Sequence, residues 1–238
     1  GLGDVYKRQN ETGAIQPVAR ITERAAAQNT PVHIDAVQVA GKLPINFHEL
    51  GATTLAASAH KFGGPRGIGL LLARRTPAPL PLAFGGGQER GIRPGTVDVA
   101  SASALAAALR ESVADMEQEE TRLTALRDKL KAGIESSIDN VIINSAEPTL
   151  ASHLHVSFPG TDGDSLIMLL DAAGIEASAG SACHAGVNRM SHVLEAMGID
   201  EEHGRGSLRF SLGRMTTDED IDVVIKELPE IIRRARSV

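Results

Sequence analysis

The sequence predicts an α/β protein with a partial large domain, built on a mostly parallel sheet, and a smaller α+β domain that follows it. Three observations lead to this prediction. Short strands that read as apolar on both faces alternate with helical segments in residues 17–73, a pattern typical of sheets covered by helices. A long stretch rich in Ala, Leu, Glu, Lys and Arg runs from Ala100 to Ser137. A second alternation of strands and helices then occupies the rest of the chain.

The first part of the chain is expected to contain one helix and three strands. Pro17–Gln28 reads as a short helix, with proline suited to its first turn. The apolar runs bounded by turn residues predict strands at Val32–Asp35, Ala52–Ala57 and Gly67–Ala73. The stretch 100–137 carries no turn signal before Gly133, so we interpret it as the helical bridge into the second domain.

The second domain shows its own alternation. We expect strands at Asn140–Asn144, His153–Phe158 and Ser207–Leu212. Three helices are expected in the same region: Asp164–Ala173, with Asp164 as N-cap and Gly174 as its stop; Ser191–Met197, closed by Gly198; and a C-terminal helix opened by the acids that follow Thr217.

These elements predict domains at 10–105 and 106–238. Residues 1–9 (GLGDVYKRQ) show no pattern that leads into Asn10, so we expect an extraneous segment there, such as a sequence-assembly scar, outside the fold. The natural chain is then expected to start well before residue 1.

Composition excludes several classes of protein. The net charge is −6, which provides no basic surface for nucleic acid or acidic lipid. No apolar stretch approaches the ~20 residues that a membrane span needs. The single cysteine cannot form an internal disulfide. A cytoplasmic protein is therefore the default expectation.

Lys61 and Asp35 are the residues that point to a chemistry. Each follows a predicted strand, and a lysine with an acid is the pair that pyridoxal phosphate needs: the amine forms a Schiff base with the aldehyde, and the acid keeps the pyridine nitrogen protonated. Ser58 and His60 are adjacent donors for a phosphate, and Gln38 could reach the ring hydroxyl oxygen. The alternatives are ordinary ones, an exposed strand-end lysine and an aspartate that caps a turn.

Other candidates are weaker. Cys183 lies among Ser, Ala and Gly, a setting that fits a reactive thiol better than a buried small residue. His184 could deprotonate that thiol, although we favour a solvated side chain. His153 and His155 alternate on a strand and could start a metal site, but no cysteine or acid is nearby, so we interpret them as sheet residues and expect no metal.

Several motifs, in order along the chain, resemble the cysteine desulfurases, fold-type I pyridoxal-phosphate enzymes of the class-V aminotransferase group. They are Asn-Glu-Thr-Gly at 10–13, His-Ile-Asp-Ala-Val-Gln at 33–38, Ser-Ala-His-Lys at 58–61, Gly-Gly-Gly-Gln-Glu-Arg-Gly-Ile-Arg-Pro-Gly-Thr at 85–96, Gly-Ser-Ala-Cys at 180–183, Ser-His-Val-Leu at 191–194 and Ser-Leu-Arg-Phe-Ser-Leu-Gly-Arg at 207–214. The Gly-Ser-Ala-Cys loop is similar to that of the housekeeping and nitrogen-fixation branch.

The resemblance implies a role for each matched residue. Lys61 would carry the cofactor and move the proton of the substrate α-carbon, and Cys183 would take the sulfur as a persulfide. Arg209, assisted by Asn10, would hold the carboxylate of L-cysteine. The remaining implied cofactor contacts are Asp35, Gln38, Ser58, His60 and Asn10, together with Thr96, which would reach the phosphate of a neighbouring subunit in a homodimer.

The resemblance also implies a sulfur-accepting partner and a missing N-terminal part of the large domain. A sulfur acceptor would be an iron–sulfur scaffold or a tRNA-thiolation enzyme. The family's phosphate-binding turn and ring-stacking histidine precede the matched region, so the large domain is expected to be incomplete. Three functions follow from the sequence: a cysteine desulfurase, an inactive fragment or interaction module, and a related lyase or aminotransferase, which the Gly-Ser-Ala-Cys loop disfavours.

Overall fold

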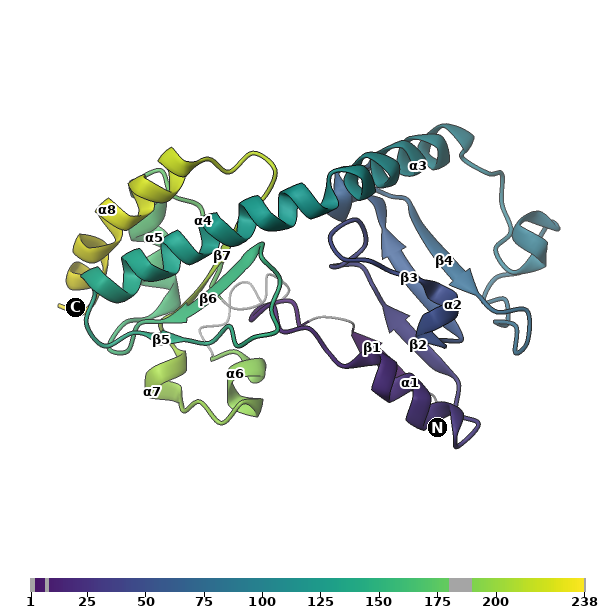
Figure 1. The fold of residues 1–238 in the computed structure, drawn as a ribbon, viewed down its shortest axis with the longest axis horizontal. Coiled ribbons are helices and arrows are strands. Elements are labelled where there is room, and N and C mark those ends of the chain that lie inside the picture. Colours follow the sequence, from purple (N-terminus) through teal and green to yellow (C-terminus); the bar gives the residue numbers. More distant parts are fainter. Residues whose placement is uncertain (1–2, 7–8, 180–189, 238) are drawn as a thin grey trace. The chain divides into compact units, whose positions relative to one another are not determined.

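A computed structural model describes residues 3–6, 9–179 and 190–237 (Figure 1). The chain forms two compact units. The first comprises residues 1–8 and 16–117, and the second comprises residues 9–15 and 118–238. The mixed α/β class is confirmed, and the sheet of the first unit is partly parallel.

The first unit contains a four-stranded sheet in the order β1-β2-β3-β4. The strands are β1 (Gly3–Tyr6), β2 (Val32–Asp35), β3 (Thr54–Ser58) and β4 (Gly69–Ala73). The first three run parallel, and β4 adds to β3 in the antiparallel direction. The helical elements of this unit are α1 (Val18–Ala26), α2 (Phe47–Leu50), α3 (Val99–Ala114) and the 3₁₀ turns η1 (Ala59–Phe62) and η2 (Gln88–Gly91).

The sequence-based expectations for this unit need three corrections. Residues 3–6, expected to lie outside the fold, belong to the sheet, because they pair with β2 from Gly3 to Tyr6. The unit ends at Glu117 and not at residue 105, since Leu105 packs with Phe62 and the Ser112 hydroxyl donates to the Phe62 carbonyl oxygen at 2.9 Å. The edge strand β4 is largely exposed, in contrast to the two-faced burial expected of it.

The second unit contains an antiparallel sheet in the order β5-β6-β7, made of β5 (Ile142–Ile143), β6 (His153–Ser157) and β7 (Ser207–Ser211). Its helices are α4 (Met116–Ser137), α5 (Gly163–Ala172), α6 (His192–Ala196), α7 (Glu201–Gly204) and α8 (Asp218–Ala235). Apolar side chains of α4, α5 and α8 form one core with those of β6 and β7.

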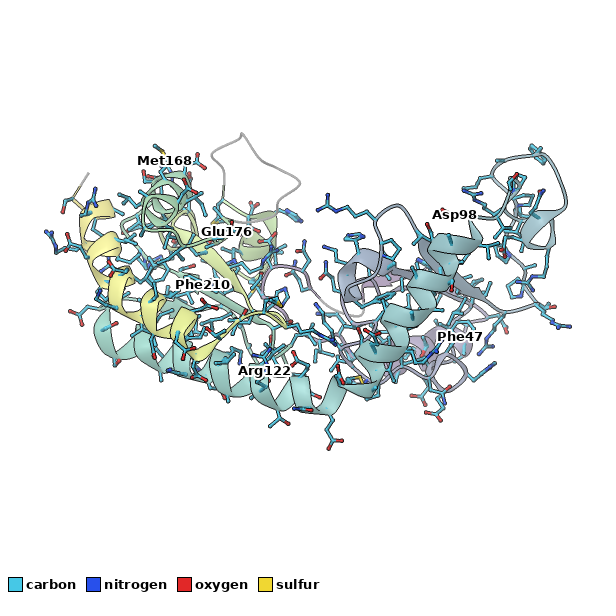
Figure 2. All side chains as sticks on the ribbon, turned by 90° about the horizontal axis from the view of Figure 1, so that it is seen from above. Phe47, Asp98, Arg122, Met168, Glu176 and Phe210 are labelled. Carbon is cyan, nitrogen blue, oxygen red and sulfur yellow. The ribbon has the colours of Figure 1, made fainter. Side chains whose placement is uncertain are left out.

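Alternation along β6 and β7 gives this sheet two different faces. Leu154 and Val156 of β6, and Leu208 and Phe210 of β7, belong to the apolar core. Figure 2 shows Phe210 inside this unit and Met168 of α5 on its outside, in agreement with exposures of 4% and 74%. The residues between them on each strand are polar and face the other way, because successive side chains of a strand point to opposite faces. That polar face carries the candidate site of the unit.

The helix ends follow the expected capping chemistry with one difference. Thr217 caps α8 in a capping box with Asp220. Ser191 caps α6. The N-cap of α5 is Asp162 and not Asp164, because Asp162 has the extended backbone of a cap and its carboxylate accepts from the Ser165 amide at 3.0 Å. The predicted helix at 100–137 is divided into α3 and α4 at Asp115.

Candidate functional site

In the first unit, the chemistry-bearing residues follow the ends of two neighbouring strands. Asp35 is the last residue of β2 and Ser58 is the last residue of β3. Because β2 and β3 are parallel neighbours, their carboxyl ends lie at the same edge of the sheet. This is the edge at which open α/β sheets bind ligands. The end of β2, at Asp35, and the end of β3, which leads into Lys61, therefore lie at the same end of the sheet.

Local geometry shapes the segment that carries Lys61. Residues 59–62 form η1, which ends at Gly63 with φ +85°, a left-handed conformation that favours glycine. The hydroxyl of Ser58 and Nδ1 of His60 lie 2.8 Å apart. Lys61 is half-buried and His60 is exposed. Ser58 and His60 thus form one pair of hydrogen-bonding groups beside the lysine.

Asp35 is held in place by its own backbone. Its Oδ1 accepts from the amide of Val37 at 2.8 Å, which leaves further lone pairs of the carboxylate for a ligand. The adjacent strand residue His33 contacts the Thr54 hydroxyl through Nδ1 at 2.7 Å. The amine, carboxylate, hydroxyl and imidazole that follow these strand ends are groups that fit the aldehyde, the ring nitrogen and the phosphate of pyridoxal phosphate.

Two further residues of the expected cofactor site, Gln38 and Thr96, lie outside the strands and η1. Gln38 lies in the turn after β2, and Thr96 is exposed in the segment between η2 and α3. Cys183 and His184 lie outside the described residues. Gly85, Gly86 and Gly87 directly precede η2, with Gly87 at its N-cap position.

Arg209 is the centre of the candidate site of the second unit. Its Nη1 donates to Oδ1 of Asn10 at 3.0 Å and to the Asn10 carbonyl oxygen at 3.2 Å. Arg209 and Asn10, the two residues that the resemblance implies for the substrate carboxylate, are thus hydrogen-bonded to each other. Burial lowers the pKa of Arg209, and the negative charge of Glu11 opposes that shift.

The segment 9–15 is held near Arg209 by hydrogen bonds to residues 145–150. Ala14 bridges Thr149, and the Ile15 amide donates to the Pro148 carbonyl oxygen at 2.8 Å. Gly13 has φ +81°, and a Cβ on it would lie 2.6 Å from Oγ1 of Thr149. Glycine is therefore required for this close approach. Sequence reasoning identified Asn10 but not the reason that the next residues, Glu-Thr-Gly, accompany it.

Three serines that bond to Arg209 or Glu11 were not predicted as site residues from the sequence. The Ser191 hydroxyl donates to Oε2 of the buried Glu11 at 2.6 Å. Ser178 and Ser211 contact the guanidinium of Arg209 at 3.3 and 3.1 Å. The signal for Ser211 was available, because residues i and i+2 of a strand share a face. Ser178 gave no such signal, since its bridge to β7 joins distant segments.

His155 lies opposite Arg209 in the sheet and is completely buried. Its Nδ1 contacts Nδ2 of Asn144 at 3.0 Å, and Asn144 also donates to the Ser157 hydroxyl. Burial lowers the pKa of His155 to about 4, and the positive charge of Arg209 acts in the same direction. His155 is thus neutral at pH 7. Both it and His153 are sheet residues, and within residues 3–6, 9–179 and 190–237 no group of three potential ligands could hold a metal ion.

The buried neutral His155 predicts acid sensitivity. The folded state takes up the proton near pH 4 and the unfolded state near pH 6.5, so the unfolded state binds more protons between these values. The free energy of unfolding should therefore fall by about 3 kcal/mol as the pH drops from 7 to 4. Urea unfolding at several pH values measures this free energy of unfolding. As the pH drops from 7 to 4, the difference between the unfolding free energies of the wild type and of His155→Asn should become smaller. A difference that stays constant with pH contradicts the prediction.

Comparison with known proteins extends this picture. Residues 4–224 match the model of the family described as aminotransferase class V. The chain is 48% identical over 237 residues to an IscS-like cysteine desulfurase of Mycobacterium tuberculosis, covering 99% of the chain and 60% of that relative. It is 39% identical to the cysteine desulfurase NifS of Azotobacter vinelandii, over 96% of the chain and 57% of the relative.

Solved structures agree. A NifS-like protein from Rickettsia africae superposes with a TM-score of 0.89 at 29% identity, over 98% of the chain and 62% of that structure. A second NifS-like protein gives 0.88 at 36% identity, over 98% and 61%. The chain thus spans about three-fifths of the length of these relatives. Motifs, strand order and family match coincide, and the chain belongs to the class-V aminotransferase family.

Proposed function

We propose that the intact protein is a pyridoxal-phosphate-dependent cysteine desulfurase, which converts L-cysteine into L-alanine and transfers the sulfur to Cys183. The observation that carries this proposal is the half-buried Arg209 guanidinium with Asn10 at its side. A guanidinium in that setting is suited to the carboxylate of an amino acid. The similarity to desulfurases over nearly the whole chain supports the reaction type.

The first unit would hold the cofactor. Lys61 would attach it, Asp35 would keep a proton on its ring nitrogen, and Ser58 and His60 would bind its phosphate, with Gln38 on the ring oxygen. Bound pyridoxal phosphate supplies an electron sink for the substrate α-carbon. The Lys61 amine would remove the proton from that carbon and return a proton later in the reaction.

The second unit would hold the substrate and supply the nucleophile. Arg209 and Asn10 would orient the carboxylate. The Cys183 thiolate would attack the sulfur of L-cysteine, so that an S–S bond forms while the bond between Cβ and sulfur breaks. The electron pair of the broken bond stays with the carbon fragment, which is protonated and leaves as alanine. Cys183 is left as a persulfide.

We further infer a homodimer in which Thr96 reaches the phosphate bound by the neighbouring subunit. The segment between β4 and α3, which contains Thr96, also exposes large apolar side chains, with Leu82 99% and Phe84 91% exposed. Exposed apolar side chains of this size are typical of an interface. The sulfur acceptor would be an iron–sulfur scaffold or a tRNA-thiolation enzyme in the cytoplasm. No helix in the described part of the chain is long and apolar enough to cross a membrane.

Replacing Arg209 by lysine in the full-length protein tests the proposal. Lysine keeps the positive charge but loses the two-pronged geometry of the guanidinium. We expect kcat/KM for L-cysteine to fall by about a hundredfold, mainly through KM, as charged hydrogen bonds to the carboxylate are lost. Arg233→Lys, a change at a surface arginine paired with Glu230, is the matched control. Equal kcat/KM values for the two variants would refute the assigned role.

A further inference from the structure

The two edges of the Arg209 guanidinium have different surroundings. The Nη1 edge faces Asn10, to which it donates twice. The edge formed by Nε and Nη2 faces two serine hydroxyls instead: Nε donates to Oγ of Ser211 at 3.1 Å, and Nη2 donates to Oγ of Ser178 at 3.3 Å. Ser211 is exposed, whereas Ser178 and Arg209 are half-buried.

The backbone fixes both serines beside Arg209. Ser211 is two residues further along β7 and therefore shares its face. Ser178 is the direct antiparallel partner of Arg209: the Arg209 amide donates to the Ser178 carbonyl oxygen at 2.7 Å, and the Ser178 amide donates back at 3.2 Å. One serine thus comes from the same strand and the other from across the bridge, and both reach the same edge of the guanidinium.

The positions of these oxygens correspond to those of a ligand. A carboxylate bound side-on to an arginine places its two oxygens against Nε and Nη2. Here two neutral hydroxyl oxygens accept from those same nitrogens. A serine side chain that changes its χ1 rotamer moves its oxygen off the guanidinium, and its hydroxyl can then donate to a carboxylate that takes its place.

The charge balance favours such a ligand. Over residues 3–6, 9–179 and 190–237, no carboxylate forms an ion pair with Arg209, and the groups hydrogen-bonded to it are neutral. The nearby Glu11 carboxylate is bonded to Ser191. A partly buried cation without an ion pair is stabilised when an anion binds to it.

We propose that Ser178 and Ser211 are substrate-binding residues that complete the carboxylate subsite of Arg209. The substrate carboxylate binds to the Nε and Nη2 edge, the two hydroxyls turn from accepting to donating, and Asn10 keeps the opposite edge in place. The inference rests on the proposed function and deepens it, because it assigns one edge of Arg209 and two serine hydroxyls to the α-carboxylate and so favours thiols that carry a carboxylate over thiols that lack one.

The test uses the full-length protein and 3-mercaptopropionate, which carries the thiol and the carboxylate of cysteine but no amine. Its dissociation constant is measured by calorimetry for the wild type, Ser178→Ala, Ser211→Ala and the corresponding threonine variants. We expect each alanine variant to bind roughly tenfold more weakly, the loss expected for one hydrogen bond to a charged group. The threonine variants keep the hydroxyl and should restore binding.

Control variants distinguish a wrong assignment of the two serines from a wrong carboxylate role for Arg209. Ser165→Ala removes a hydroxyl bonded to Asp162 in the first turn of α5 and should leave binding unchanged. Because Ser211 is exposed, Ser211→Ala tests the inference even where Ser178→Ala does not fold. Wild-type affinity in both alanine variants, with affinity lost in Arg209→Lys, overturns the serine assignment alone. Wild-type affinity in Arg209→Lys as well overturns both this inference and the carboxylate role of Arg209.

Discussion

Lys61→Ala is expected to abolish covalent attachment of pyridoxal phosphate and, with it, all measurable turnover of L-cysteine. The amine of Lys61 is the group proposed both to attach the cofactor and to move the proton of the substrate α-carbon, so its removal eliminates two functions together. In the structure this lysine follows the strand end that lies beside Asp35. No other residue of η1 offers an amine.

The measurement is an absorbance spectrum after incubation with pyridoxal phosphate, followed by borohydride reduction and mass spectrometry of the product. Lys226→Ala changes an exposed lysine of α8 and should leave both readouts unchanged. The spectrum should be recorded for the 238-residue chain and for the full-length protein. An adduct in the 238-residue chain that disappears with Lys61→Ala shows that these residues alone build the cofactor site. An adduct retained in Lys61→Ala contradicts the assignment.

Cys183→Ala should leave the cofactor bound but remove sulfur transfer. The thiolate is the proposed acceptor of the substrate sulfur, and alanine offers no nucleophile in its place. Alanine production from L-cysteine should fall by at least about a thousandfold, the scale of loss seen when a catalytic nucleophile is removed. The visible spectrum of the bound cofactor should stay that of the wild type, because Lys61 is unchanged.

Persulfide formation is the specific readout for this second prediction. Cys183 is the single cysteine of the 238 residues, so a thiol-labelling experiment on a peptide from this region reports on one site. Cys183→Ser is a useful companion, because it retains the size of the side chain but not the thiolate. Undiminished production of alanine by both variants would show that the sulfur leaves by another route and would exclude the desulfurase mechanism proposed above.

Much of the fold could be read from local sequence. The strand at Val32–Asp35 was predicted with its observed bounds, and the caps at Ser191 and Thr217 lie where a serine or threonine precedes a helix. These features depend on residues within one turn or one short run, so periodicity and capping chemistry are enough. The domain boundary was less accessible, because the packing of α3 on Phe62 depends on residues far apart in the chain.

The sequence by itself indicated the family and the strand ends that carry Asp35 and Lys61, because the family motifs and the strand-end residues are short and local. Only the tertiary structure decided that residues 9–15 belong with the C-terminal unit, that His155 lies buried and neutral opposite Arg209, and that Ser178 faces the same guanidinium. The physical reason is that these contacts join segments separated by tens to hundreds of residues. A pairing between strands has no local signature, since it is set by which polar groups find a partner when the apolar face of the sheet is buried.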